Sequence, residues 1–270
     1  MDLKIQEINM LNDAMFKSIM RSEEARPLVN KLLHFLTNIE MEKLEHAIFM
    51  GGEIPKKNLK EKGKISDVLI KVENSQIILE LNQYDTRDIF DKNVSYAFAL
   101  STVSTKIGER RKKVILINFD AFNRFKTNTP ILIFQPRDEE GHIETELYSS
   151  IHILLENIPN TSYNIPKEIE TFLDFFKRYE SIEELKGKYK RKGEFQGMVK
   201  KVEELTSDEE FVLYYDLEEK HKQEKESAYE LGVERGGQKK QIEIAKKMLI
   251  EKEPVKKIID YTGLTEEEIK

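Results

Sequence analysis

Asp67 and Glu80 are the residues whose types and spacing carry the clearest chemistry in this chain. They lie in the segment ISDVLIKVENSQIILELNQ (65–83), which predicts two apolar strands joined by a polar turn. Side chains alternate between the two faces of a strand. One face of the predicted hairpin therefore carries Asp67, Lys71, Glu80 and Asn82. Two neighbouring carboxylates repel each other unless a positive charge lies between them. A divalent metal ion in an open cleft is one interpretation of this face, and an ordinary hairpin with a polar face is the other.

The register of this hairpin follows from the position of its turn. A turn centred on Asn74-Ser75 pairs Asp67 with Asn82, and Leu69 with Glu80. The opposite face then carries only apolar side chains: Val68, Ile70, Val72, Ile77, Leu79 and Leu81. We therefore expect one face to be buried and the other to hold the polar groups.

The composition narrows the class of protein. The chain has 270 residues, of which 39% are hydrophobic and 35% charged, as expected for a globular protein with a highly charged surface. The absence of cysteine excludes disulfides and thiolate metal sites. No apolar run approaches the ~18 residues of a membrane span, so we expect a cytoplasmic protein without membrane contact. The net charge of -6 argues against a protein that coats nucleic acid by bulk charge, but not against a local basic groove.

Helical and strand patterns alternate in the first two thirds of the chain. Helices are predicted in 10–38 and 86–107, a polar loop in 51–64, and strands in 113–119, 131–135 and 147–155. Beyond 181 the pattern is helical, with a joint predicted at Gly232, Gly236 and Gly237. We therefore predict an α/β core (1–180), a charged helical connector (181–237) and a small all-α tail (238–270).

Several motifs occur in an order that resembles a known family. They are Asn12-Asp13-x-x-Phe16-Lys17, Ser66-Asp67-Val68, Ile78-Leu79-Glu80-Leu81-Asn82, a helix with Phe90, Lys92 and Tyr96, and the tail IAKKMLIEKEPVKKIIDYTGLTEEEIK. This ordered set resembles the PD-(D/E)xK nuclease-family transposases, also called the recombination-promoting nuclease/transposase-like family. The resemblance covers most of the chain, although no single motif is specific.

The resemblance implies a restriction-endonuclease-like mixed sheet flanked by helices, and Mg²⁺-dependent hydrolysis of DNA, with Mn²⁺ as a possible substitute. It implies that Asp67 and Glu80 bind the metal, that the residue at 82 orients or activates water, and that Asp13 is an additional acid. The superfamily has Lys at the third motif position and this family commonly has Gln, whereas this chain has Asn82. Asparagine can orient water but carries no charge. A nuclease fold that only binds DNA or a protein partner is therefore the rival hypothesis, and RNA is a further possible substrate.

The remaining candidates each have a plainer interpretation. Two carboxylates and the Leu81 carbonyl would suffice for Mg²⁺. Lys71 could supply the missing positive charge, and Lys71 and Lys92 could contact phosphate, or both could be solvated surface lysines. Asp13 could instead cap a helix. The five histidines suggest no metal cluster, and no Ser/His/Asp arrangement stands out. The tail predicts either a helix-turn-helix for DNA or a homodimer interface.

Overall fold

The computed structural model describes the chain in two compact units. Its description leaves out residues 1–4, 6, 55–63, 104–110, 160–161 and 266–270. The first unit covers residues 1–215 and the second covers residues 216–270.

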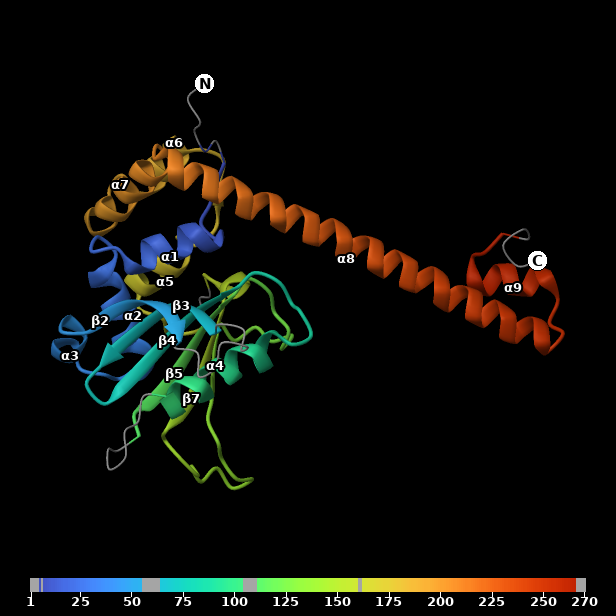
Figure 1. Ribbon diagram of the computed structural model, residues 1–270, viewed down its shortest axis with the longest axis horizontal. Coiled ribbons are helices and arrows are strands. Elements are labelled where there is room, and N and C mark those ends of the chain that lie inside the picture. The colour runs from blue at the N-terminus through green and yellow to red at the C-terminus, as the bar shows by residue number, and fades with distance from the viewer. Residues whose placement is uncertain (1–4, 6, 55–63, 104–110, 160–161, 266–270) are drawn as a thin grey trace. The chain divides into compact units, whose positions relative to one another are not determined.

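A six-stranded mixed sheet forms the centre of the first unit (Figure 1). Its strands, in spatial order, are β2 (Ile48–Ile54), β3 (Lys64–Val72), β4 (Ser75–Asn82), β5 (Lys113–Asp120), β7 (Tyr148–Leu154) and β6 (Ile131–Phe134). The β4, β5 and β7 strands run parallel, and the other pairs are antiparallel. The predicted restriction-endonuclease-like α/β class is confirmed by this mixed sheet and its flanking helices.

The hairpin forms as predicted but turns one residue earlier. Val72 pairs with Ser75, so the two-residue turn is Glu73-Asn74 rather than Asn74-Ser75. Glu73 has a φ of 34°, the positive φ that tight hairpin turns require. Each residue of β3 therefore pairs two positions earlier on β4 than predicted. Because side chains alternate with a period of two, the same residues stay on the same faces of the hairpin. The paired positions end at Val68 and Leu79, and the next step brings Asp67 opposite Glu80.

The edge strand β2 was not foreseen. Residues 51–54, predicted to belong to a polar loop, continue β2 beside β3. The pairing shifts register between Gly51 and Gly52, a β-bulge of the kind that bends an edge strand. Lys64, the last residue of that predicted loop, begins β3, and residues 55–63 lie outside the described residues.

The two faces of the sheet pack against different helices (Figure 1). The predicted apolar face packs with β5 and β7 residues into the main core. The helices on that side are α1 (Asp13–Arg21), α2 (Arg26–Thr37), α3 (Met41–Glu45), α5 (Lys167–Leu173), α6 (Ile182–Tyr189) and α7 (Gln196–Leu205), with the 3₁₀ turns Leu155–Asn157 and Gly193–Phe195 and the short strand pair β1 (Ile8–Asn9) and β8 (Arg178–Tyr179). The other face packs through Leu69 and Ile78 against α4 (Ile89–Val103). Both faces are therefore covered, although we expected one to be polar and open.

The second unit is helical. The α8 helix (Glu209–Ile250) begins in the first unit and continues without a break through the glycines at 232, 236 and 237, so the predicted joint is wrong. The α9 helix (Val255–Thr262) follows, with Pro254 before it and Gly263 at a φ of 69° after it, as a helix C-cap requires. The small core of this second unit is formed by Ala245, Ile258 and Leu264. No helix in the described part of the chain has an apolar stretch of the length that a bilayer requires.

Phe16 anchors α1 to the sheet. Its ring is fully buried and packs edge-on against Phe119 at 5.1 Å and Phe176 at 5.4 Å. Truncating a buried phenylalanine removes apolar contacts and leaves a cavity. We predict that Phe16→Ala lowers the free energy of unfolding by about 3–5 kcal/mol in urea titrations. Phe98→Ala is the control, since Phe98 is 57% exposed, and it should cost less than about 1 kcal/mol. Equal losses in the two variants would contradict this anchoring role.

Candidate active site

Asp67 lies at the point where the backbone pairing of β3 and β4 ends. Its Oδ2 accepts a hydrogen bond from the backbone N–H of Leu81 at 2.7 Å. Its Oδ1 lies 3.2 Å from Nζ of Lys17 on α1. One helical turn later, Arg21 donates to the main-chain carbonyl of Asp67. The carboxyl group is thus fixed by a strand on one side and by a helix on the other.

Glu80 lies on the neighbouring strand and is buried, with 3% of its surface exposed. Among the described residues its Oε1 has no hydrogen-bond partner. Burial, followed by repulsion from Asp67, raises the pKa of Glu80 well above its usual value, although Lys92 and the Asp67 backbone N–H oppose this. Glu80 is therefore a buried acid without enough positive charge around it.

The pKa of Asp67 is also raised, to about 6. Burial is the main cause and the charge of Asp13 adds to it, whereas Lys17 and the Leu81 N–H oppose the rise. Only 8% of Asp67 is exposed, so the two acids do not line the open cleft that we expected. A pair of buried carboxyl groups with raised pKa values favours the binding of a cation, which would let both ionise.

The structure connects Asp13 to this pair through Lys17. Asn12, not Asp13, caps α1, because its side chain accepts from the backbone N–H groups of Ala14 and Met15. Asp13 forms an ion pair with Lys17 one turn along the helix, and Lys17 also reaches Asp67. Asp13, Lys17 and Asp67 therefore form one chain of charges that begins on α1.

The two lysines considered as phosphate contacts lie differently. Lys71 pairs with Gln76, four residues along β3 from Asp67, which is about 13 Å at the usual strand rise. Lys92 is exposed on α4, and its charge lowers the pKa of Glu80. The charge of Lys92 thus acts on Glu80, whereas Lys71 is at the far end of the hairpin.

Asn82 belongs to a buried hydrogen-bond network on the α4 side of the sheet. Its Nδ2 donates to Asp120 Oδ1 at 2.7 Å and to Asn118 Oδ1 at 3.2 Å. Its Oδ1 accepts from Nδ2 of Asn93 on α4 at 2.9 Å. Both amide hydrogens are used, so one lone pair of Oδ1 is what remains to orient water.

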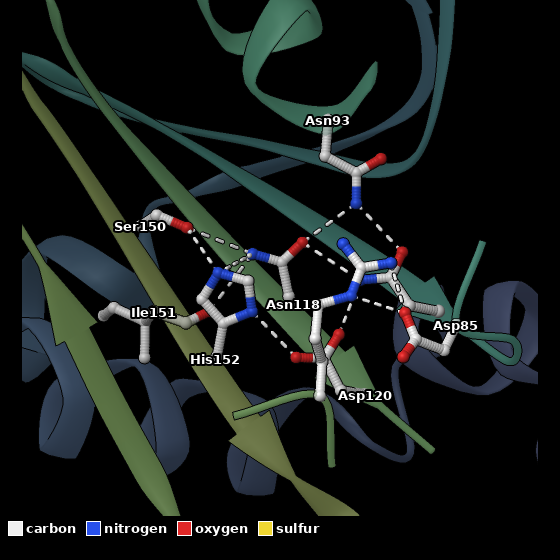
Figure 2. Close-up of polar contacts among 9 residues, drawn as sticks. Asp85, Asn93, Asn118, Asp120, Ser150, Ile151 and His152 are labelled. Atoms are coloured by element: carbon white, nitrogen blue, oxygen red, sulfur yellow. Dashed lines mark hydrogen bonds and ion pairs between the residues drawn. The ribbon is translucent and has the colours of Figure 1, made fainter. Parts of the chain in front are cut away.

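The network extends across β5 and β7 (Figure 2). Asn93 also donates to Asn118, whose Nδ2 lies within 3.4 Å of Ser150 Oγ, the Ile151 carbonyl and His152 Nε2. His152 Nδ1 lies 2.7 Å from Asp120 Oδ2, and its Nε2 lies 3.1 Å from Ser150 Oγ. Figure 2 shows Asn93 pointing from its helix onto the strands, where the other members meet.

This network, including its Ser/His/Asp set, was not predicted from the sequence. The available signal was the spacing of two between Asn118 and Asp120, and between Ser150 and His152, within apolar strands. Three phenylalanines enclose His152, with ring centres 4.5 to 5.4 Å from its own: Phe90, Phe125 and Phe134. Nearby, Arg124 pairs with Asp85 and lies over the Phe90 ring. Ser150, His152 and Asp120 are all buried, so we assign the set to holding Asn82 and the strand ends in place.

The donors fit a divalent cation bound by few protein ligands. Among the described residues, no group of three or more His, Cys, Asp or Glu side chains is arranged to hold a metal ion. Mg²⁺ is nevertheless commonly held by one or two carboxylates and keeps several waters. Asp67 and Glu80 supply carboxylate oxygens of this kind, and Glu80 Oε1 has no hydrogen-bond partner among the described residues. A role for the Leu81 carbonyl stays a prediction.

Glu80→Gln should stabilise the protein in a pH-dependent way. The folded protein holds the Glu80 proton to higher pH than the unfolded chain, so stability is lost as pH rises through the raised pKa. Glutamine removes that charge. We predict that, in metal-free buffer, the variant melts about 2–4 °C above the wild type at pH 8, as expected from about 1 kcal/mol, and that this difference shrinks towards pH 4.5.

The control is Glu203→Gln, because this glutamate is a half-exposed partner of Lys186 and should show no such pH dependence. A Glu80→Gln variant that melts below the wild type at pH 8 would show that a partner stabilises the ionised Glu80.

A comparison with known proteins identifies a family that matches this chain. The family described as PD-(D/E)XK nuclease family transposase matches residues 10–232, which include α1, the Asp67–Glu80 hairpin and the Asn82 network. A comparison with curated proteins found no significant match. The match covers most of the chain, and the protein belongs to the PD-(D/E)XK nuclease family transposases.

Proposed function

We propose that the protein is a metal-dependent DNA endonuclease that hydrolyses phosphodiester bonds. The observation that carries this proposal is the placement of Asp67 and Glu80, two buried acids on adjacent strands with raised pKa values. Buried acids with perturbed pKa values cluster at functional sites. Family membership supports a nuclease role linked to mobile elements or recombination.

The residues divide the work of hydrolysis. Asp67 and Glu80 would hold Mg²⁺, with Mn²⁺ as a substitute, and the Leu81 N–H keeps the Asp67 carboxyl in its orientation. The bound ion would lower the pKa of a water molecule and polarise the phosphate. Asp13 adds negative charge next to Asp67, which favours a cation there. Lys92 lies beside Glu80 on an exposed helix surface, where it can contact a phosphate of the DNA.

One observation favours the rival function, a nuclease fold that binds DNA without cutting it. Asn82 occupies the third motif position, and three members of the buried network already use most of its hydrogen-bonding capacity. If water at the site depends on this residue, catalysis is impaired while the fold and the DNA surface persist.

The α8–α9 helices are our candidate for the interface of a homodimer, which cutting both strands would favour.

A plasmid assay tests the proposal. Purified full-length protein is incubated with supercoiled plasmid at pH 7–9, with Mg²⁺, Mn²⁺ or a chelator. We predict metal-dependent nicking by the wild type, reduced at least ~100-fold in Asp67→Asn and in Glu80→Gln, because each loses a charged oxygen ligand. Asp174→Asn is the control, since it removes an ion-paired aspartate outside the site and should nick as the wild type does.

Three outcomes would contradict the proposal. Absence of nicking across all metals and pH values, with DNA binding intact in gel-shift assays, would favour the non-catalytic rival. Cleavage of single-stranded RNA but not plasmid would overturn the substrate. Nicking that survives in both site variants would place the chemistry elsewhere, or in a contaminant.

A further inference from the structure

The positive charge that the motif lacks at position 82 is present beside Asp67, on a different element. Lys17 Nζ lies 3.2 Å from Asp67 Oδ1 and also forms an ion pair with Asp13. The ammonium therefore bridges two of the three acids. The side chains of Lys17 and Asp13 are about one quarter exposed, whereas that of Asp67 is 11% exposed, so the bridge lies at the border between solvent and the buried pair.

The α1 helix holds this ammonium firmly in position. Asp13, Lys17 and Arg21 follow one another at intervals of four residues, so they lie along one side of α1. Phe16 fixes the helix in the core, between Phe119 and Phe176. Arg21 binds the main-chain carbonyl of the same aspartate that Lys17 contacts through its side chain. The position of Lys17 is thus set by a packed helix and not by a loose surface side chain.

The other candidates for this charge are placed less well. Asn82 is neutral and is held by the buried network. Lys71 lies at the far end of the hairpin, paired with Gln76. Lys92 is exposed, and its Nζ lies 5.3 Å from the centre of the Tyr96 ring. Among the residues that the structure describes, Lys17 is the lysine in direct contact with Asp67.

We propose that Lys17 is the catalytic ammonium of this site, in place of the residue at position 82, and that it competes with a divalent cation for Asp67. This inference rests on the proposed nuclease function. An ammonium held beside Asp67 can neutralise the charge that develops on a phosphate bound there. The same contact stabilises Asp67 in the absence of metal, so a divalent cation must share or displace it.

This competition predicts a pair of effects on metal affinity and cleavage rate that a purely structural role for Lys17 would not produce. Removing its charge should strengthen metal binding, because the acids lose their internal partner, and should slow cleavage. We compare Lys17→Met, Lys17→Gln and Lys17→Arg by calorimetric titration with Mg²⁺ and Mn²⁺ and by single-turnover plasmid cleavage at saturating metal. The control is Lys31→Met, which removes a lysine of α2 that lies outside the site and is ion-paired with Glu168 and Glu194.

We predict that the two neutral variants bind Mg²⁺ at least about fivefold more tightly than the wild type and cleave at least ~100-fold more slowly. Lys17→Arg should keep the wild-type metal affinity within about twofold and a larger share of the cleavage rate, because it keeps the charge. Lys31→Met should match the wild type in both measurements. Circular dichroism and urea titration establish which variants are folded, and having two neutral variants keeps the test valid if one fails.

Other results separate this inference from the proposed function. Weaker metal binding together with slower cleavage in folded neutral variants would make Lys17 structural and overturn the inference. Unchanged affinity or an unchanged cleavage rate would also overturn it, while leaving a nuclease in place. If the wild type binds metal but cleaves no nucleic acid, the proposed function and the catalytic role of Lys17 fail together, and the titrations decide whether Lys17 competes for Asp67.

Discussion

The burial of Asp67 and Glu80 side by side is the constraint on which the rest of this structure depends. Two carboxyl groups removed from water cannot both ionise cheaply, and their pKa values rise for that reason. The fold responds with positive groups brought in from outside the hairpin: Lys17 and Arg21 from α1, and Lys92 from α4. The Leu81 N–H completes the set. Even so, the Glu80 Oε1 is left without a partner among the described residues. This unpaired oxygen is unfavourable for stability, and it supports the proposal that the site binds a cation.

The two faces of the sheet divide the tasks of stability and positioning. One face is mainly apolar and joins the main core with α1, α2 and α5 to α7. The other face is apolar under part of α4, at Leu69 and Ile78. It is polar near the ends of β4, β5 and β7, where it carries Asn82, Asp120 and His152. Each member of that polar region finds a partner within the sheet or on α4, which fixes the relative heights of three parallel strands. A half-satisfied network would cost more than an apolar core. Most of its polar atoms are paired, although the buried Asn93 Oδ1 has no hydrogen-bond partner among the described residues, and this pairing explains why buried asparagines are tolerated here.

Local periodicity accounts for what could be predicted from the sequence. The alternation in residues 65–83 placed Asp67 and Glu80 on one face, and a turn shifted by one residue did not alter this, because pairing is conserved in steps of two. Non-local pairing accounts for what was missed. The strand at 51–54 has two glycines and no alternation, and only its partner β3 makes it a strand. Lys17 lies fifty residues before Asp67, and His152 lies seventy after Asn82, and no local pattern joins them. The glycines at 232–237 favoured a break, yet α8 continues through them.

These placements explain how the third position of the motif can change without loss of the fold. A lysine at position 82 would meet Asp120 and the Asn118 amide inside a closed network, where an ammonium has to be paired at once. Asparagine satisfies the same neighbours without a charge and leaves Asp120 free to pair with His152. The cost of that arrangement is that positive charge near the acids must come from another element. Because α1 is fixed by Phe16 and reaches Asp67 through both Lys17 and Arg21, it can supply that charge with a geometry as well defined as that of a strand residue. The positive charge of the site is then a property of how α1 packs against the sheet, and it is not visible in the hairpin motif alone.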